Sequence, residues 1–307
     1  ADSSNAGHAE QFAQLCRDCG IAPSVALPSA PRPDDAVDHP TPDRVATVVT
    51  APAHPPAPVR PDPPLELTCF GPLRLTIDGR LIDLHPLRPK ARSVLRLLAA
   101  HGGDPVHREL IAERLWPETA VDAGIHNVQV AISALRRQIE PDAARGGPSV
   151  IERSDDSYRF AAPDGSDVDL WDVLSDVDLG RALARRGEAT GAIEAFTRAL
   201  DMARTELFPE EGLNEWVVDA RSRLSADLAR TCDELADLHR ERGDHRDVVT
   251  TCERGLRIDP FRDRLWRLMI DALGDLGFHA AAAHAQLRYR TICDELGLPR
   301  DLVTTSS

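Results

Sequence analysis

The residues best suited to chemistry lie on one face of a predicted helix that covers residues 121–140. Apolar residues recur there at steps of three and four, which predicts an amphipathic helix with a buried stripe. The opposite face and its flanks carry His126, Asn127, Gln129, Val130, Ser133, Ala134, Arg136 and Arg137, with no carboxylate before Glu140. Amides and guanidinium groups hydrogen-bond to base edges and phosphates, so this face is a candidate DNA-reading surface. A helix whose polar face meets only water is the alternative.

Other patterns in the chain offer little further chemistry. Cys16 and Cys19 form a single C-x-x-C pair with no second pair nearby, so chance spacing competes with a zinc or redox role. The sequence contains no G-x-x-x-x-G-K-[ST], H-E-x-x-H or G-x-S-x-G, and its 11 histidines are scattered. We therefore expect neither an enzyme nor a bound cofactor or metal.

Length and composition indicate a globular protein with room for two domains and a tail. The chain has 307 residues, of which 42% are hydrophobic. Its net charge of −14 argues against bulk attraction to nucleic acid or to an anionic membrane. Six cysteines in a chain this long are typical of reduced thiols, and no apolar run approaches the roughly 18 residues that span a bilayer. We expect a cytoplasmic chain without a membrane segment. It begins at Ala1 rather than methionine, which is consistent with a piece of a longer protein.

Residues 1–64 are expected to form a tail. Prolines crowd the stretch 23–64, and proline fixes φ and lacks the backbone donor that a helix or a sheet interior needs. We expect a largely disordered, semi-extended linker, with a proline-motif ligand for a partner as the alternative.

Residues 65–162 predict a small sheet, three helices and a closing hairpin. Gly71-Pro72 and Asp78-Gly79 break the first alternating runs, and Asp-Gly between such runs is a strong hairpin signal. The expected strands cover residues 65–70, 73–77 and 80–84, the helices 89–100, 107–116 and 121–140, and the hairpin strands 150–153 and 158–161. This order is that of an α+β winged helix-turn-helix domain, in which we expect Trp116 and Tyr158 to belong to the core.

Basic residues accompany the predicted reading helix on the neighbouring elements. They are Arg88, Lys90 and Arg92 at the start of the first helix, His107 and Arg108 at the start of the second, and Arg153 and Arg159 beside the hairpin tip. Cationic side chains and the backbone N–H groups at helix starts both attract phosphate. For each residue taken alone, a solvated surface charge is an equal alternative.

Five stretches of this segment, in order, carry a family resemblance: GPLRL, PLRPKARSVLRLLAAHGG, ELIAERLWP, NVQVAISALRRQIEP and SYRF. They resemble the OmpR-like DNA-binding domain at the head of the Streptomyces antibiotic regulatory protein family. The resemblance implies that the third helix enters the major groove and that the hairpin, or wing, lies along the neighbouring minor groove. The wing departs from the family pattern, because Asp155-Asp156-Ser157 precede the tyrosine where glycine is common. The segment has equal numbers of acidic and basic residues, so specific binding would depend on paired copies.

Residues 163–307 predict an all-α domain of stacked helical pairs. Three similar stretches begin at Gly187, Gly243 and Gly277, and the last two glycines are 34 residues apart, which is the tetratricopeptide period. The longer first step indicates an insertion near residues 205–220. Small residues where helices cross would let them approach closely.

This half also carries motifs of the same family: FPEEGLNEWVVDARSRL, DPFRDRLWRLMIDALGDLG and YRTICDELGLPRD. They resemble the bacterial transcriptional activator domain, which implies a role in dimerisation and contact with RNA polymerase through its sigma or alpha subunit. The sequence thus predicts a transcription regulator, an activator by the family resemblance, that binds direct repeats in double-stranded DNA as a homodimer. The alternative is a helical-repeat scaffold for protein partners with a vestigial winged helix, which the acidic wing and the neutral charge favour.

Overall fold

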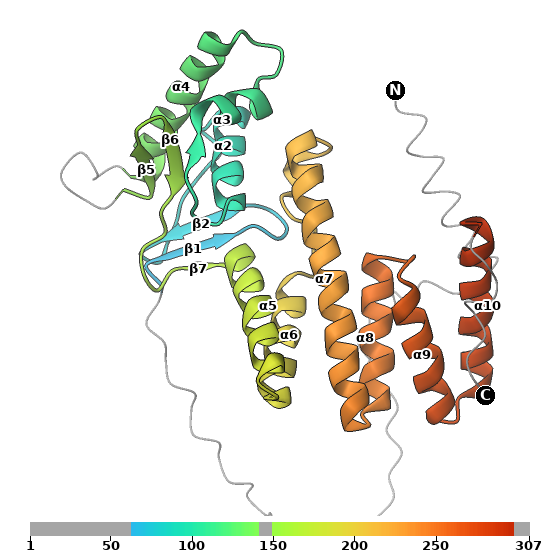
Figure 1. Cartoon of the computed structure of the whole chain (residues 1–307). Helices are drawn as coiled ribbons and strands as arrows, with labels where there is room; N and C mark the ends of the chain where they lie inside the picture. The colour runs from blue at the N-terminus through green and yellow to red at the C-terminus, as the bar shows by residue number, and fades with distance from the viewer. Residues whose placement is uncertain (1–62, 141–148, 298–307) are drawn as a thin grey trace, which may run out of the picture. The chain divides into compact units, whose positions relative to one another are not determined.

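The computed structural model describes residues 63–140 and 149–297, and all of them belong to one compact unit. Except for Pro63 and Pro64, the predicted tail lies outside the described residues, and Cys16 and Cys19 lie outside them as well. Two parts follow each other along the chain, as the sequence predicts: an α+β head that contains a winged helix, and a helical half (Figure 1).

A four-stranded sheet forms the base of the head, in the order β3-β2-β1-β7. β1 (Leu65–Thr68) pairs antiparallel with β2 (Arg74–Ile77), and β2 pairs antiparallel with β3 (Arg80–Leu81). β3 is shorter than the strand predicted over 80–84, although the Ile82 N–H still donates to the Leu75 carbonyl oxygen at 2.8 Å. β7 (Asp167–Val168) pairs in parallel with β1 and leads directly into the helical half, so the sheet joins the two parts of the chain.

Three helices and a second sheet complete the head. The helices are α2 (Pro89–Ala100), α3 (Arg108–Leu115) and α4 (Val121–Ile139), and the strands, in the order β4-β6-β5, are β4 (Val106–His107), β5 (Ile151–Ser154) and β6 (Ser157–Phe160). His107 was expected in the second helix. Instead it pairs with Ser157 in β4, and its ring accepts a hydrogen bond from the Glu109 N–H as the cap of α3. Tyr158 is buried, whereas Trp116 is half-buried against the core.

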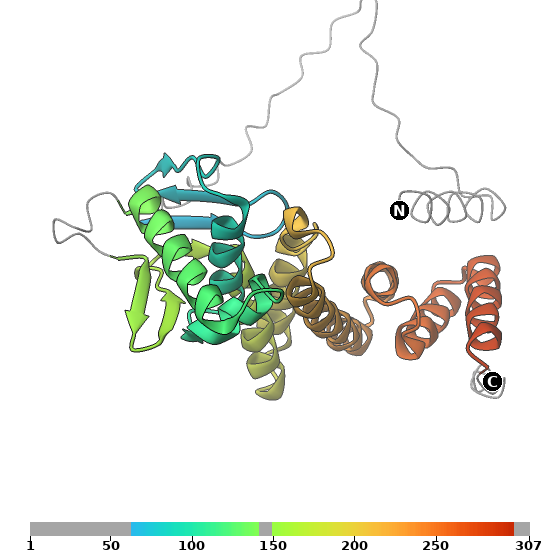
Figure 2. The same cartoon turned by 90° about the horizontal axis from the view of Figure 1, so that it is seen from above.

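The helical half consists of antiparallel helices that lie side by side (Figures 1 and 2). Its elements are α5 (Asp169–Arg185), α6 (Ala189–Met202), the short 3-10 helix η2 (Pro209–Glu211), α7 (Glu215–Arg242), α8 (His245–Ile258), α9 (Asp263–Asp275) and α10 (His279–Glu295). Neighbouring helices along the chain pack against each other, so the apolar faces form one continuous core.

The three glycines that mark the repeats share one local structure. Gly187, Gly243 and Gly277 have φ values of 77°, 76° and 75°, a left-handed conformation that glycine adopts without steric cost. In each case the N–H of the next residue donates to the carbonyl five residues back, as with Glu188 and Leu183, which is the hydrogen bond of a Schellman helix end. The similarity of the three stretches therefore reflects three equivalent helix ends.

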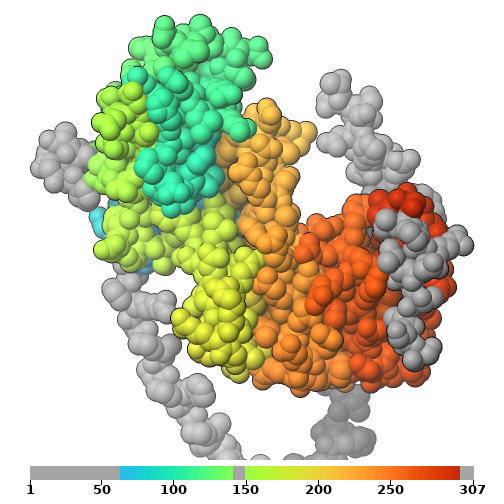
Figure 3. Space-filling view, viewed as in Figure 1, coloured from blue at the N-terminus to red at the C-terminus, as the bar shows by residue number. Residues whose placement is uncertain are grey.

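The segment between α6 and α7 docks on the head, which the sequence did not predict. Phe208 is fully buried, and its N–H donates to the Cys69 carbonyl oxygen at 2.9 Å. Arg221 of α7 holds the segment by donating to the carbonyl oxygens of Leu207, Phe208 and Gly212 at 2.7–2.8 Å. The space-filling view shows the first part of α7 against the head (Figure 3). The head and the helical half thus share a packed seam.

Candidate nucleic-acid interface

One row of side chains on α4 is exposed along the length of the helix. It consists of His126, Gln129, Val130, Ser133 and Arg137, whose spacing of i, i+3, i+4, i+7 and i+11 places them on one face. Val130, the apolar member of the row, is 50% exposed. Because all five are exposed, the rest of the described chain leaves this row uncovered. Arg137 has no hydrogen-bond or ion-pair partner among the described residues.

The opposite face of α4 holds the row in place. Val128, Ile132 and Leu135 are buried where the helix packs on α2 and α3. Gly124 lies close to α3, since a Cβ added there would lie 3.1 Å from the Ala112 Cβ. The remaining predicted site residues of α4, Asn127 and Arg136, are half-buried at the edges of the exposed row, as is Ala134.

Glu140 and Arg136 join the C-terminal end of α4 to the wing. The Glu140 carboxylate is buried and accepts hydrogen bonds from the N–H groups of Val150 and Ile151 at 2.6 and 2.7 Å. Arg136 donates from Nε and Nη2 to the Ile151 carbonyl oxygen at 3.0 and 2.7 Å. The Arg136 guanidinium therefore already has a structural partner. Sequence patterns could not reveal Glu140 as an anchor, because its partners lie ten residues further along the chain.

The wing carries charges of both signs that largely pair with one another. Ser154 pairs with Ser157 across the hairpin, so Asp155 and Asp156 form its turn. Asp155 has a φ of 50°. Asp156 forms an ion pair with Arg108 at 2.8 Å, and Arg159 pairs with Glu152. Arg153 donates from Nε to the Asp155 carbonyl oxygen at 2.8 Å. Asp155 is exposed at the tip and has no ion-pair partner in the described part of the chain.

Two of the predicted phosphate-binding residues at the start of α2 line a cleft. Lys90 and Arg92 line a cleft between the head and the helical half, and no residue of α4 or of the wing lines that cleft. Arg88 is exposed beside them and does not line the cleft. Lys90 and Arg92 thus line a cleft that includes no residue of the α4 row, although Gln138 of α4 donates to the Asp83 carbonyl oxygen at its edge at 2.7 Å.

Metal-ligating residue types come together at one place in the described chain. His239, Asp244 and Asp247 have donor atoms within 4.8 Å of one another at the turn between α7 and α8. Burial lowers the pKa of His239, and the two carboxylates lie at the start of α8, where acidic residues also stabilise a helix N-terminus. We therefore assign no metal to this group.

Comparisons with known proteins identify both parts of the chain. Residues 84–159 match the family model described as "Transcriptional regulatory protein, C terminal", and residues 168–306 match "Bacterial transcriptional activator domain". A search among curated proteins gave no match. Among solved structures, Mycobacterium tuberculosis EmbR, in complex with a low-affinity phosphopeptide, is similar with 24% identity and a TM-score of 0.63. The match covers 79% of this chain and 63% of the EmbR chain, and at this identity it establishes the fold.

These matches define the class of the protein. An OmpR-like winged helix followed by a bacterial transcriptional activator domain is the composition of a transcriptional regulator. More particularly, this order of the two models matches the architecture of the Streptomyces antibiotic regulatory protein family, as the sequence motifs predict. None of the helices in the described ranges is both long and apolar enough to cross a bilayer.

Proposed function

We propose that the chain is a sequence-specific DNA-binding transcription regulator, an activator that inserts α4 into the major groove. The observation that carries this proposal is the exposed α4 row of His126, Gln129, Val130, Ser133 and Arg137. An amphipathic helix held by its apolar face on two other helices is the element that reads the major groove in winged and other helix-turn-helix domains.

Each member of the row suits a different contact with a base pair. Arg137 can donate a fork of two hydrogen bonds to guanine, Gln129 can pair with the edge of adenine, and Val130 can pack on a thymine methyl group. The Ser133 hydroxyl donates to the Gln129 carbonyl oxygen at 2.8 Å, so toward DNA it acts as an acceptor. His126 is the first member of the row, and Asn127 lies at its edge near the start of the helix.

The wing supplies backbone contacts in this proposal. Arg153 and Arg159 lie beside the wing tip, and Arg108 reaches it from the start of α3. Each would exchange a partner in the wing for a phosphate oxygen. Because each arginine must give up its partner in the wing, a phosphate contact gains less free energy than one made by an unpaired arginine. Affinity for random DNA should therefore be weak, and two copies bound to a direct repeat would supply the remaining affinity.

The helical half supplies the protein contacts in this proposal. It would support the homodimer on DNA and contact the sigma or alpha subunit of RNA polymerase in the cytoplasm, without a cofactor. The sequence of this half has an excess of acidic residues, which suits a protein partner better than a nucleic acid.

Selection from a random duplex library tests the proposal. The full chain should enrich a motif with two half-sites in the same orientation. The Arg137→Ala variant should enrich a motif that is less restricted at one position of each half-site. Arg186→Ala, an exposed arginine of the helical half without a described partner, is the matched control and should leave the motif unchanged. Recovery of unrelated sequences by the wild-type chain would contradict the proposal.

A second function, a protein-interaction scaffold with a vestigial winged helix, is favoured by one observation. The wing carries Asp155 at its tip, and the Arg159 and Arg108 side chains are already neutralised by Glu152 and Asp156. In that case the selection would enrich nothing, and the helical half would still bind its protein partner.

A further inference from the structure

A cleft of about 750 Å³ lies between the head and the helical half. The hairpin of β2 and β3, the start of α2, and the η2 turn with Asn214 form its walls. Its volume falls within the range of roughly 300–1,000 Å³ that is usual for small-molecule sites, and sites at domain boundaries are common. No residue of the α4 row lines it, so it is separate from the proposed DNA interface.

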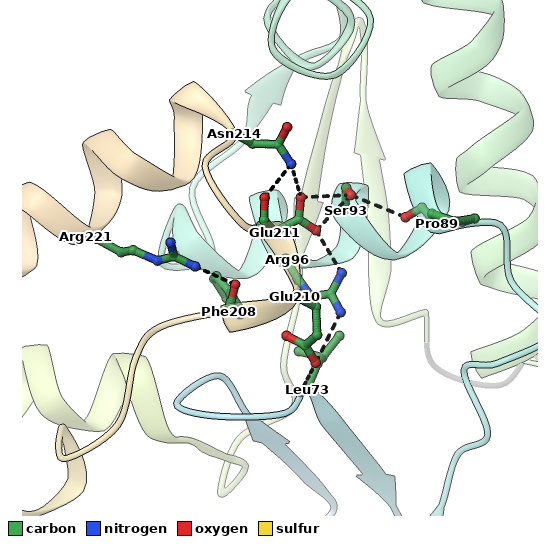
Figure 4. A network of polar contacts seen from close by, with 9 residues as sticks. All are labelled: Leu73, Pro89, Ser93, Arg96, Phe208, Glu210, Glu211, Asn214 and Arg221. Carbon is green, nitrogen blue, oxygen red and sulfur yellow. Dashed lines mark hydrogen bonds and ion pairs between the residues drawn. The ribbon is translucent and has the colours of Figure 1, made fainter. Parts of the chain in front are cut away.

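A network of hydrogen bonds and ion pairs forms the floor of the cleft (Figure 4). Glu211 accepts hydrogen bonds from Arg96 Nη1 and Ser93 Oγ, both at 2.8 Å, and from Asn214 Nδ2 at 3.0 Å. Glu210 accepts from the Leu73 N–H at 2.8 Å and pairs with Arg96 Nη2 at 3.4 Å. Both carboxylates are therefore hydrogen-bonded within the protein, and the single charge of Arg96 balances one of the two.

Cationic groups of the cleft are left without such partners. Lys90, Arg74 and Arg92 line it, and none of them has an ion pair or a side-chain hydrogen bond within the described ranges. The Nε atoms of Arg92 and of Arg96, which is only 5% exposed as a whole residue, are buried and have no acceptor in the described part of the chain. The remaining carboxylate of the lining, Asp83, is hydrogen-bonded to the His85 ring at 3.0 Å. The lining thus has four cationic side chains (Arg74, Lys90, Arg92 and Arg96) against three carboxylates (Asp83, Glu210 and Glu211), a formal balance of one positive charge, and its unused groups are donors.

Apolar side chains stand beside these cations. Leu81 is 66% exposed at the edge of the cleft, although a leucine on a strand is more often buried. Pro72 and Pro89 are also exposed there, and Leu73 is half-buried. An occupant that satisfies both kinds of surface has an anionic end for Lys90 and Arg92 and an apolar body for Leu81.

We propose that this cleft binds a small amphipathic anion, in which a carboxylate, sulfonate or phosphate is attached to an apolar body. Since the lining comes from both parts of the chain, the bound anion stabilises the seam between head and helical half by mass action. The site goes beyond the proposed function, because it needs no DNA and uses none of the α4 row.

The test uses 8-anilino-1-naphthalenesulfonate, a fluorescent amphipathic anion, with the full chain. We expect one saturable site. The double variant Lys90→Gln/Arg92→Gln should weaken binding by at least about tenfold, because it removes two cationic partners of the sulfonate. Arg88→Gln, which removes a neighbouring exposed cation outside the cleft, should change it less than about twofold. The neutral analogue N-phenyl-1-naphthylamine should bind much more weakly. Equal binding by the double variant, or equal binding of the neutral analogue, would overturn the proposal.

Hydrogen exchange on the wild-type chain gives a second measurement that does not depend on the folding of a variant. The bound sulfonate should slow amide exchange within residues 81–96 and 208–214, on both sides of the cleft. Slowed exchange elsewhere, with no change in these two stretches, would overturn the proposal.

Duplex binding by the same double variant separates this inference from the proposed function. Loss of sulfonate binding with unchanged duplex affinity supports the cleft. Loss of duplex affinity with unchanged sulfonate binding would assign Lys90 and Arg92 to DNA and overturn the cleft. If the wild-type chain binds the sulfonate in the cleft but no duplex, the proposed function fails and the cleft stands.

Discussion

Arg96 Nη1 of α2 donates to Glu211 Oε1 of η2 at 2.8 Å, and the two side chains are only 7% and 2% exposed. This buried ion pair joins two parts of the chain that are 115 residues apart in sequence. Because a buried charge without its partner is strongly destabilising, the pair favours one arrangement of the head on the helical half. The direction in which α4 is presented is thereby coupled to the fold of the helical half.

Truncation of Glu211 should destabilise the whole described unit. Glu211→Ala leaves the Arg96 guanidinium and Ser93 Oγ without their main acceptor in a buried position, and removing one partner of a buried pair costs about 3–5 kcal/mol. The matched control is Glu210→Ala, whose side chain is 38% exposed and which should cost about 1 kcal/mol or less. Urea-induced unfolding followed by circular dichroism measures both. Equal losses of the free energy of unfolding for the two variants would show that burial of the Arg96–Glu211 pair does not contribute the extra stability.

The close packing of α7, α8 and α9 should depend on Gly255. A Cβ added at Gly255 would overlap Leu265 Cδ1 and lie 2.8 Å from Cys232 Cβ, so Gly255→Ala should cost at least about 1–3 kcal/mol through overpacking. Gly274→Ala is the control within the same repeats. Nothing lies within 4 Å of its added Cβ, and alanine has the higher helix propensity, so the variant should gain up to about 1 kcal/mol. Thermal unfolding of the two variants should therefore shift in opposite directions.

Two adjacent arginines of α4 should respond differently to truncation. Arg136→Ala removes two hydrogen bonds to the Ile151 carbonyl oxygen and should lower the free energy of unfolding by about 1–3 kcal/mol. Arg137→Ala should change stability by less than about 0.5 kcal/mol. On a selected duplex, however, it should lower affinity by about 1–3 kcal/mol if it reads a base. Chemical unfolding and fluorescence anisotropy separate the two effects. A stability loss for Arg137→Ala with unchanged affinity would remove it from the interface.

The exposed carboxylate at the wing tip should oppose DNA binding. Asp155→Asn removes the charge and keeps a residue type that tolerates the φ of 50°, so the turn should persist. Duplex affinity should rise by up to about 1 kcal/mol at low salt, the energy of two unit charges about 4 Å apart in water. Asp156→Asn is the contrasting variant, because it breaks the ion pair with Arg108 as well. No gain for Asp155→Asn at any salt concentration would place the wing tip away from phosphate.

Stability should decline in alkaline solution through the thiol of Cys232. Burial raises the pKa of Cys232 from 9.0 to about 12, so the folded chain holds this proton more tightly than the unfolded chain. The resulting stabilisation is complete below about pH 9 and is lost as the pH rises toward about 12. The free energy of unfolding should therefore fall more steeply between about pH 9 and 11 for the wild type than for Cys232→Ala. Parallel curves for the two proteins would contradict this prediction.

Local signals in the sequence predicted much of the fold. The bounds of α2 are those expected, because Pro89 at its start and the glycines after it are strong local signals. The exposed row of α4 follows from its apolar period, and the glycines at 187, 243 and 277 mark the helix ends of the repeats.

Pairing across long separations in the sequence was not predictable in this way. β7 pairs with β1 about a hundred residues away, and Asp169 next to it caps the N–H groups of Cys69 and Phe70. Nothing in the composition of residues 204–214 signals that they dock on the head. From the sequence alone, Lys90 and Arg92 were predicted to belong to the DNA site. In the fold they line a cleft that includes no residue of α4, and its far wall comes from residues more than a hundred positions away. Their role in DNA binding, like that of each predicted contact, stays a prediction.

The central claim is that the exposed row of α4 reads a DNA sequence. It is tested most directly by the ratio of affinities for a selected duplex and a scrambled one, measured by anisotropy at about 50 and 200 mM salt. A reader of base edges keeps a ratio of at least about a thousandfold at both salt concentrations, although both affinities fall as counterions compete. A ratio near one, with all binding lost at the higher salt, would contradict the claim.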